Sequence, residues 1–178
     1  MYVCVCVQWN VFSHECTKTV ALEMPARCCA FSPDGRRLAI GFGSPRKLSN
    51  RQFDGKWCVA FADTYLHTNL PTNLPCRIVL DTTDFQMTHE ARDSTKWLTD
   101  MKYSPNGELL AIGGYDHKIY IYSVNSGYAL NGVVGQHQSF ITALDFSEDS
   151  LWLRSNCGGF ELFYFEADTV SGQAERPN

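Results

Sequence analysis

Apolar and polar residues alternate along three stretches of the chain, at residues 27–31, 97–103 and 140–146. A period of two is typical of a β-strand that buries one face. The period of three to four residues that marks an amphipathic helix does not occur along the sequence. The pattern therefore predicts an all-β protein.

Each stretch is followed by the same kind of turn and by a second apolar run. Residues 27–41 and 99–113 align without gaps and share Ser, Pro, Gly, Leu, Ala, Ile and Gly, and residues 142–156 repeat their apolar pattern. Proline presets φ at the first central position of a turn, and Asp, Asn and Gly suit the positions after it. We therefore expect tight turns at 32–35 and 104–107, with a degenerate copy at 147–150.

The second repeat shows how one unit continues. A turn at Tyr115–His117 leads to Ile119–Tyr122, which is apolar on both faces, as expected of a middle strand. A looser fourth strand is expected near Tyr128–Val134. Four strands in about 43 residues correspond to one blade of a β-propeller. We predict a partial, open propeller of the WD type, with about three four-stranded blades and one strand, Val3–Trp9, from a preceding blade.

The whole chain, residues 1–178, is expected to form a single partial propeller segment. We divide it into the end of a preceding blade at 1–19, a blade with insertions at 20–90, a blade at 91–135, and a blade with a polar tail at 136–178. One insertion covers Gly43–Phe53, and a tandem tetrapeptide with two prolines lies within Tyr65–Pro75, which we expect to be an exposed loop.

The expected number of blades is too small to close a ring. Propellers close with four to eight blades. We therefore expect an open arc that belongs to a longer chain with further blades. Its end blades would expose apolar faces, so we also expect the isolated chain to associate or aggregate.

Three residues match positions that hold a WD blade together. Gln136-His137 resembles the Gly-His pair of the WD repeat, Asp116 matches its hairpin aspartate, and Trp9-Asn10 resembles its Trp-Asp pair. We interpret Asp116, His137 and Trp9 as structural blade residues.

Other positions depart from the WD pattern. Tyr122 and Phe165 replace the usual Trp, and Gly159 replaces the usual Asp. The hydrogen-bond network of an ordinary blade is therefore expected to be incomplete, and aromatic packing to be more important. We expect five aromatic side chains to be mostly buried between adjacent sheets: Phe31, Trp97, Tyr103, Phe140 and Phe146.

From about Trp9 to Phe165 the chain resembles one WD family in particular, the echinoderm microtubule-associated protein-like (EMAP-like) proteins. Met24–Arg27 is similar to the Pro-Ala-Arg entry to a blade in that family, and Gly55–Val59 with Ala62–Thr64 resembles a strand that follows. Further resemblances cover Tyr103–Gly113, Asp116–Tyr122, His137–Ser147, Ser155-Asn156 and Glu161–Tyr164.

The resemblance implies a piece of the second propeller in a tandem of two atypical propellers. The family binds tubulin and microtubules and is not enzymatic. The resemblance thus implies a non-enzymatic scaffold in the cytoplasm, associated with the cytoskeleton, whose partners are tubulin, microtubules or other proteins. The alternative is a generic WD adaptor in a multiprotein complex, for instance a ciliary or ubiquitin-related one. A propeller enzyme would need charged residues that converge on the central channel, and the sequence shows no such set.

Composition and charge narrow the possible partners. The chain has 178 residues, a net charge of −4 and a pI near 5.7, which argues against a dedicated nucleic-acid-binding protein. A hydrophobic fraction of 44% is enough for a folded core. No run of about 20 apolar residues occurs, so we expect no membrane span.

The residues that could carry chemistry form no recognised motif. The chain has 8 cysteines, but no C-x-x-C spacing, and we interpret them as buried free thiols that act as small hydrophobic residues. A nucleophile elbow, a phosphate-binding glycine loop and an H-E-x-x-H motif do not occur in the sequence. We expect no catalytic residue, no metal and no cofactor.

A small basic cluster is the candidate surface for a partner. Arg46, Lys47, Arg51 and Lys56 lie in and beside the first insertion. The exposed surface of tubulin is acidic, so a basic loop at the rim of a propeller would be attracted to it. The alternative is an ordinary solvated loop with a chance excess of basic residues.

Overall fold

The computed structural model describes residues 4–10, 12–22, 26–42, 77–84, 86–94 and 96–167. This described part consists of strands β1 to β13 and their connecting turns, without a helix. Accordingly, no helix in these ranges has the length and apolar character required to cross a lipid bilayer. The prediction of an all-β protein is confirmed.

The strands form four antiparallel sheets in which sequence neighbours pair. A two-stranded sheet contains β1 (Cys4–Trp9) and β2 (Cys16–Leu22). The first blade contains β3 (Ala26–Phe31), β4 (Arg37–Phe42), β5 (Arg77–Asp81) and β6 (Met87–Ala91). The second blade contains β7 (Leu98–Tyr103), β8 (Leu109–Gly114), β9 (Ile119–Ser123) and β10 (Ala129–Val134). The third blade contains β11 (Ile141–Phe146), β12 (Trp152–Cys157) and β13 (Leu162–Glu166).

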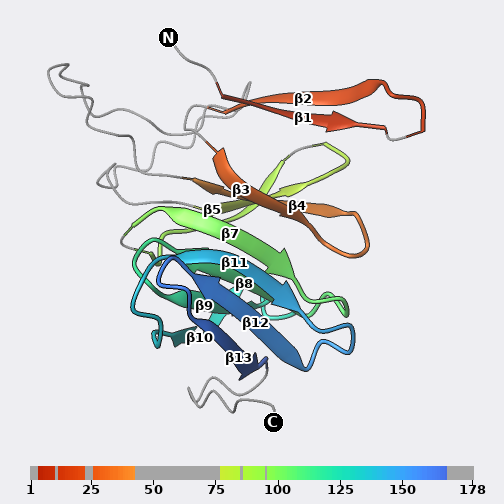
Figure 1. Cartoon of the computed structure of the whole chain (residues 1–178). Helices are drawn as coiled ribbons and strands as arrows, with labels where there is room; N and C mark the ends of the chain where they lie inside the picture. The colour runs from red at the N-terminus through yellow and green to blue at the C-terminus, as the bar shows by residue number, and fades with distance from the viewer. Residues whose placement is uncertain are drawn as a thin grey trace, which may run out of the picture.

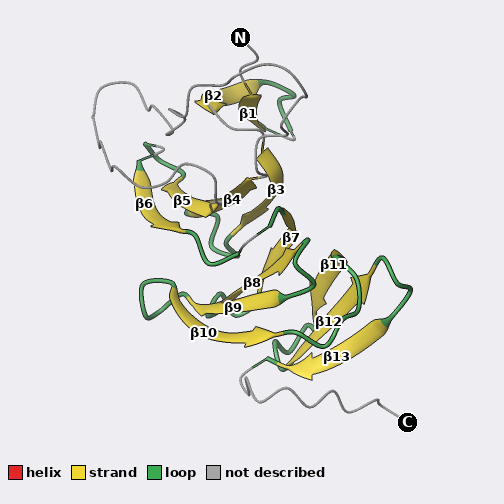
Figure 2. Cartoon of the chain, turned by 90° about the vertical axis from the view of Figure 1, so that its left-hand side faces the viewer, coloured by secondary structure: helices red, strands yellow, loops and turns green. Residues whose placement is uncertain are grey.

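The sheets are arranged as an open arc. Strand β7 lies between β3 and β11, so the first strands of the three blades run side by side (Figure 1). The two-stranded sheet and the third blade lie at opposite ends of the arc, as Figure 2 shows from another side. The prediction of a partial propeller that does not close is confirmed.

The turn between the first two strands of each blade has the same geometry in all three blades. In the first and second blades, the N–H of Gly35 and Gly107 donates to the carbonyl oxygen three residues earlier, at 2.9 Å. Both glycines have positive φ, 68° and 76°, which a residue with a side chain rarely adopts. Ser150 makes the same bond in the third blade with a φ of 63°, so the degenerate copy folds like the others despite its missing glycine.

Two hydrophobic clusters hold the blades together. The cluster between the first and second blades includes Ala39, Val79, Met101, Leu110, Ile112 and Tyr120, all buried. The cluster between the second and third blades includes Leu109, Ala111, Ile119, Ile121, Ile141 and Leu153. Because alternate residues of β8 and β9 belong to different clusters, the second blade buries both faces.

The prediction that Phe31 is buried is wrong. Its side chain is 49% exposed, whereas Tyr103, at the equivalent position of β7, is 8% exposed. In β3 two of the partly buried residues, Cys28 and Ala30, pack toward the second blade. Phe31 therefore points toward the preceding sheet, of which the described residues contain only β1 and β2. Tyr103 occupies the same position in β7 but has a complete blade in front of it.

The other members of that aromatic set lie between these extremes. Trp97, Phe140 and Phe146 are partly buried. Phe146 packs against the cluster between the second and third blades. Phe140 stacks on Tyr115, with ring centroids 4.6 Å apart and an interplanar angle of 11°. Aromatic packing between blades is therefore present, but most of these rings keep one side in solvent.

Several strands differ from those expected. The preceding sheet has a second strand, β2, which pairs with β1 as far as Leu22. The third strand of the first blade is Arg77–Asp81, which pairs with β4 and to which the sequence analysis assigned no strand. The third blade has three strands within the described ranges. The stretch at 55–64 that resembles a family strand, and the expected loop at 65–75, lie outside the described residues.

Candidate functional site

Polar and ionisable side chains lie close together at one place in the second and third blades. At this place the turn between the second and third strands of a blade contacts the segment that precedes its first strand. In the second blade, Asp116 lies in the turn between β8 and β9. Its Oδ2 accepts hydrogen bonds from Ser94 Oγ at 3.0 Å and from Tyr120 Oη at 2.7 Å. Asp116 thus ties the segment before β7 to the β8–β9 hairpin and to the third strand.

In the third blade, His137 lies in the segment before β11, at the position that Ser94 has in the second blade. His137 is 4% exposed, and its Nε2 lies 2.7 Å from Ser155 Oγ on β12. Its ring contacts Phe163 and Phe165 of β13, with centroids 4.7 and 6.5 Å away. Phe165 cannot extend the hydrogen-bond chain as a Trp would, so the polar connection from His137 along this path ends at Ser155.

Glu161 approaches the other ring nitrogen of His137, and Cys157 in turn contacts Glu161. Glu161 Oε2 lies 3.5 Å from Nδ1, and Cys157 Sγ lies 3.1 Å from the same carboxylate oxygen. One donor atom from each of His137, Cys157 and Glu161 lies within 4.8 Å of the other two. We call these three residues the His-Cys-Glu cluster. It brings a nitrogen, a sulfur and an oxygen ligand to one point.

The surroundings set the charge state of this cluster. Burial lowers the pKa of His137, and the neighbouring Glu161 only partly opposes this effect. The pKa of Glu161 is also lowered, first because its carboxylate accepts the backbone N–H of Gln138 at 2.9 Å and then because of Cys157. At neutral pH the cluster therefore contains a neutral imidazole and an ionised carboxylate.

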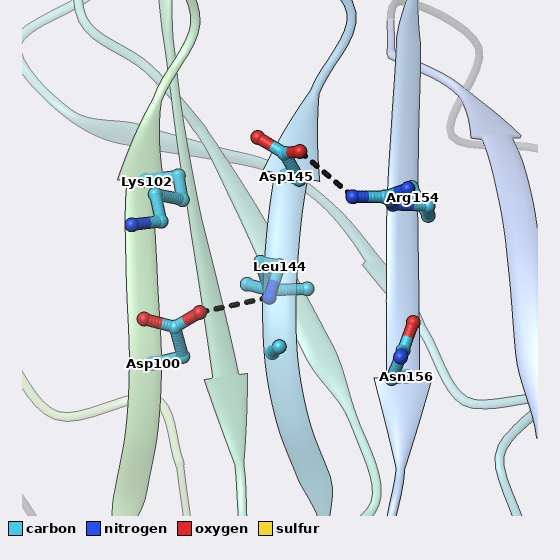
Figure 3. A pocket seen from close by; sticks show the side chains of 7 residues that line it. Asp100, Lys102, Leu144, Asp145, Arg154 and Asn156 are labelled. Atoms are coloured by element: carbon cyan, nitrogen blue, oxygen red, sulfur yellow. Dashed lines mark hydrogen bonds and ion pairs between the residues drawn. The ribbon is translucent and has the colours of Figure 1, made fainter. Parts of the chain in front are cut away.

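A pocket of about 350 Å³ lies across β7, β11 and β12, at the seam between the second and third blades (Figure 3). Asp100 Oδ2 accepts the backbone N–H of Leu144 across this seam at 2.8 Å, and Arg154 pairs with Asp145 at 2.9 Å. Lys102 and Asn156 also line it. Its walls carry both charge signs, which suits contact with a polar surface; none of its lining residues pairs a nucleophile with a base.

The predicted site residues occupy different places. Asp116 lies in the β8–β9 turn of the second blade, whereas His137 lies in the segment before β11, where the second blade has Ser94. Trp9 ends β1 and pairs with Cys16, with a register shift between Gln8 and Trp9. The basic candidates Arg46, Lys47, Arg51 and Lys56 lie outside the described residues.

Sequence reasoning missed the partners of these residues. At the 43-residue repeat spacing, Ser94 occupies the same position as His137. Because a serine does not match the histidine of the WD pattern, the sequence did not identify it as a blade residue. Glu161 lies two positions after Gly159, where the WD pattern has its aspartate, and its carboxylate reaches His137 from there. The interpretation of the cysteines as buried thiols is correct for Cys157 and wrong for Cys16 and Cys29, which are exposed.

Comparison with known proteins places this architecture in a family. A sequence profile of the second β-propeller of echinoderm microtubule-associated protein matches residues 4–178. Human echinoderm microtubule-associated protein-like 3 is 31% identical over 161 residues, covering 89% of this chain and 15% of the relative. Echinoderm microtubule-associated protein-like 4 of Xenopus laevis is 32% identical over 165 residues, covering 91% of this chain and 14% of the relative.

A further relative comes from a ciliate. The ciliary WD repeat-containing protein ctxp80 of Euplotoides octocarinatus is 42% identical over 83 residues, which is 47% of this chain and 12% of that protein. The chain therefore spans about one seventh of the length of the EMAP-like relatives. The match across 4–178, the repeated WD-type turns and the open arc of antiparallel sheets agree with one another. The chain belongs to the family of the second β-propeller of echinoderm microtubule-associated proteins, whose members are scaffold and protein-interaction proteins.

Proposed function

We propose that this chain is part of a non-enzymatic scaffold that binds tubulin or microtubules and so associates with the cytoskeleton. The observation that carries the proposal is the match to the second-propeller family across residues 4–178. Relatives that align with about nine tenths of the chain are named as microtubule-associated protein-like proteins. We also propose that all 178 residues form one propeller segment, with the preceding blade extended to Leu22 and the first blade to Ala91, as strands β2 and β6 require.

The surface chemistry supports binding of a protein rather than of a small substrate. The pocket at the seam between the second and third blades contains both signs of charge and is lined by residues of three strands. Polar, charged rims of this kind are typical of protein–protein interfaces. A scaffold needs such a surface, whereas an enzyme needs an activated nucleophile or a proton-transferring pair within reach of a substrate.

Microtubule co-sedimentation tests the proposal. We expect the full-length gene product to pellet with microtubules in a saturable manner, and the pelleted fraction to fall as salt is raised, because screening weakens attraction to an acidic surface. A full-length product that stays in the supernatant at every microtubule concentration would contradict tubulin binding.

A charge-matched pair of variants tests the basic cluster separately. The double variant Arg46→Glu/Lys47→Glu is expected to reduce pelleting several-fold if the first insertion contacts tubulin. The control Arg36→Glu/Lys118→Glu changes the net charge equally at two exposed positions of the described surface that do not line the seam pocket. Equal effects of the two variants would assign the attraction to overall charge and not to this cluster.

A second candidate function is a WD adaptor in a ciliary protein complex. It rests on the 42% identity with the ciliary protein ctxp80, which covers 47% of the chain. Affinity purification of the tagged full-length product distinguishes the two candidates. Stable recovery of a multiprotein complex, together with failure to pellet with microtubules, would favour the adaptor.

A further inference from the structure

We propose that the His-Cys-Glu cluster of the third blade is a Zn²⁺ site, with His137 Nδ1, Cys157 Sγ and a carboxylate oxygen of Glu161 as ligands. The proposal departs from our expectation from the sequence that the chain binds no metal. It rests on the positions of these three atoms in the structure. The spacing of the three residues along the sequence matches no known zinc-binding motif.

The first supporting observation is an unpartnered buried atom. His137 Nδ1 is buried and has no hydrogen-bond partner, because Glu161 Oε2, at 3.5 Å, is too distant for a good bond. A buried polar atom without a partner is costly, and native structures rarely keep one without a reason. A cation between the nitrogen and the carboxylate would satisfy both groups.

The second observation is the separation of the ligand atoms. Ligands of tetrahedral zinc lie about 2.0–2.3 Å from the metal, so they lie roughly 3.3–3.7 Å from one another. The distance from Nδ1 to Glu161 Oε2 is 3.5 Å, and that from Cys157 Sγ to the same oxygen is 3.1 Å. All three atoms lie within 4.8 Å of one another, so a small side-chain rotation would complete the triangle.

The third observation is the support around the ligands. His137 Nε2 is held by Ser155 Oγ at 2.7 Å, which leaves Nδ1 free to bind a metal and fixes the ring. The sulfur of Cys157 accepts the backbone N–H of Gly159 at 3.3 Å, a contact that fixes the position of the sulfur. Glu161 accepts the backbone N–H of Gln138. Each ligand is therefore oriented by a second group.

The local sequence explains why such a site occurs in the third blade and not in the second. In the second blade, Asp116 lies in the β8–β9 turn and accepts hydrogen bonds directly from Ser94 and Tyr120. Gly159 stands at the equivalent position of the third blade, and a side chain there would lie 3.5 Å from Cys157 Sγ. Gly159 therefore places no side chain in front of the sulfur, and the side chain of Glu161 is 28% exposed, so one side of the cluster faces solvent.

The ligand types select the metal. A thiolate and an imidazole favour zinc over calcium or magnesium, which prefer oxygen ligands only. Three protein ligands leave a fourth position for water. Bound zinc would join the segment before β11 to the β12–β13 hairpin, as Asp116 does in the second blade.

Cobalt substitution of the 178-residue chain under reducing conditions tests the site, because Co²⁺ bound to a thiolate gives a charge-transfer band in the near ultraviolet. We expect one equivalent of Co²⁺ to give this band and one equivalent of Zn²⁺ to remove it. The band should be lost in Cys157→Ser and kept in Cys29→Ser, which removes an exposed thiol. Glu161→Gln should weaken binding at least about tenfold, since even loss of an outer contact costs that much.

Other outcomes would overturn the proposal. No band at stoichiometric Co²⁺, or a band that survives in Cys157→Ser, would mean that this cluster does not bind the metal. Unchanged affinity in Glu161→Gln would exclude the carboxylate as a ligand. Circular dichroism of each variant establishes that it is folded, and a rise in the melting temperature with Zn²⁺ that is absent in Cys157→Ser gives a second measurement. Neither measurement depends on tubulin, so failure here leaves the proposed function unaffected.

Discussion

The guanidinium carbon of Arg77 lies 3.2 Å from the centroid of the Tyr122 ring. Arg77 belongs to β5 of the first blade and is 2% exposed, whereas Tyr122 belongs to β9 of the second blade. The same guanidinium donates to the carbonyl oxygen of Tyr128 at 3.3 Å and approaches Asp93 at 3.8 Å. Burial lowers the pKa of Arg77, and Tyr122 and Asp93 oppose that effect. A buried cation thus joins two blades through the residue that replaces the usual Trp.

Removing this cation should destabilise the chain. We expect Arg77→Ala to lower the free energy of unfolding by about 2–4 kcal/mol, because a desolvated cation–π contact, a hydrogen bond to the Tyr128 carbonyl oxygen and the contact with Asp93 are lost together. Arg77→Lys should recover only part of this loss, since an ammonium cannot stack as a plane on the ring. Urea unfolding followed by tryptophan fluorescence measures the difference.

Tyr122→Phe is the matched control for that prediction. It keeps the ring under Arg77 and removes only the hydrogen bond from Tyr122 Oη to Asp93, which is 2.9 Å long. The expected cost is about 1–2 kcal/mol. A loss in Tyr122→Phe as large as that in Arg77→Ala would show that the hydroxyl, and not the stacked cation, stabilises this seam.

Gly113 marks a close approach between the second and third blades. A Cβ built at Gly113 would lie 2.5 Å from Ile141 Cγ2, well inside contact distance. We expect Gly113→Ala to cost about 1–3 kcal/mol, because overpacking forces β8 and β11 apart. At Gly135 the nearest atom would be 3.9 Å away, so Gly135→Ala should be tolerated much better. Equal melting temperatures for the two variants would contradict the packing described here.

The pH dependence of stability should include a contribution from His89. Burial lowers its pKa below the ordinary 6.5, Arg77 lowers it further, and Asp93 and Glu90 oppose the shift. Below about pH 6.5 the unfolded chain therefore binds a proton at this residue more readily than the folded chain does. The free energy of unfolding should fall as the pH decreases from about 7 to about 5.

Substitution of His89 tests that assignment. His89→Gln should flatten the profile in this range, although His137, whose pKa is also lowered, contributes to the remaining slope. His14→Asn serves as the control, because His14 is exposed and Asn tolerates its φ of 56°. If the slope of His89→Gln equals that of the unmodified chain, His89 does not contribute.

The open end of the third blade should make the isolated chain associate. Trp152 on β12 and Leu162 on β13 are 37% and 47% exposed, and both side chains lie on the sheet face that points away from the second blade. Exposed apolar faces of this kind drive association. Size-exclusion chromatography with light scattering should give a mass above the 20.1 kDa of one chain.

Charged substitutions locate the surface responsible. Trp152→Lys/Leu162→Lys should shift the chain toward the mass of a monomer, because two buried cations cannot be accommodated in an apolar contact. Phe160→Lys changes an equally apolar but isolated side chain at a hairpin tip and should have a smaller effect. A monomer of 20.1 kDa at every concentration of the unmodified chain would contradict the prediction.

The sequence by itself determined the fold class, the repeat and the turns. Alternation in 97–103 and 140–146, together with the Ser-Pro-x-Gly turns, specifies strands and hairpins through local backbone preferences. These preferences act within a few residues, so the strands and turns that they produce can be predicted from short segments of the sequence. The sequence did not predict that Arg77–Asp81 is the third strand of the first blade, because a long insertion separates this strand from its partner β4.

The tertiary structure decided which side chains meet between blades. Phe31 and Tyr103 occupy equivalent positions, yet one is exposed and the other buried, because within the described residues only Tyr103 has a four-stranded blade in front of it. Arg77 meets Tyr122 between two blades, and Glu161 meets His137 within the third blade, across separations that no periodicity encodes. Alternation specifies the two faces of a strand, but the neighbour that covers each face is set by the stacking of whole sheets.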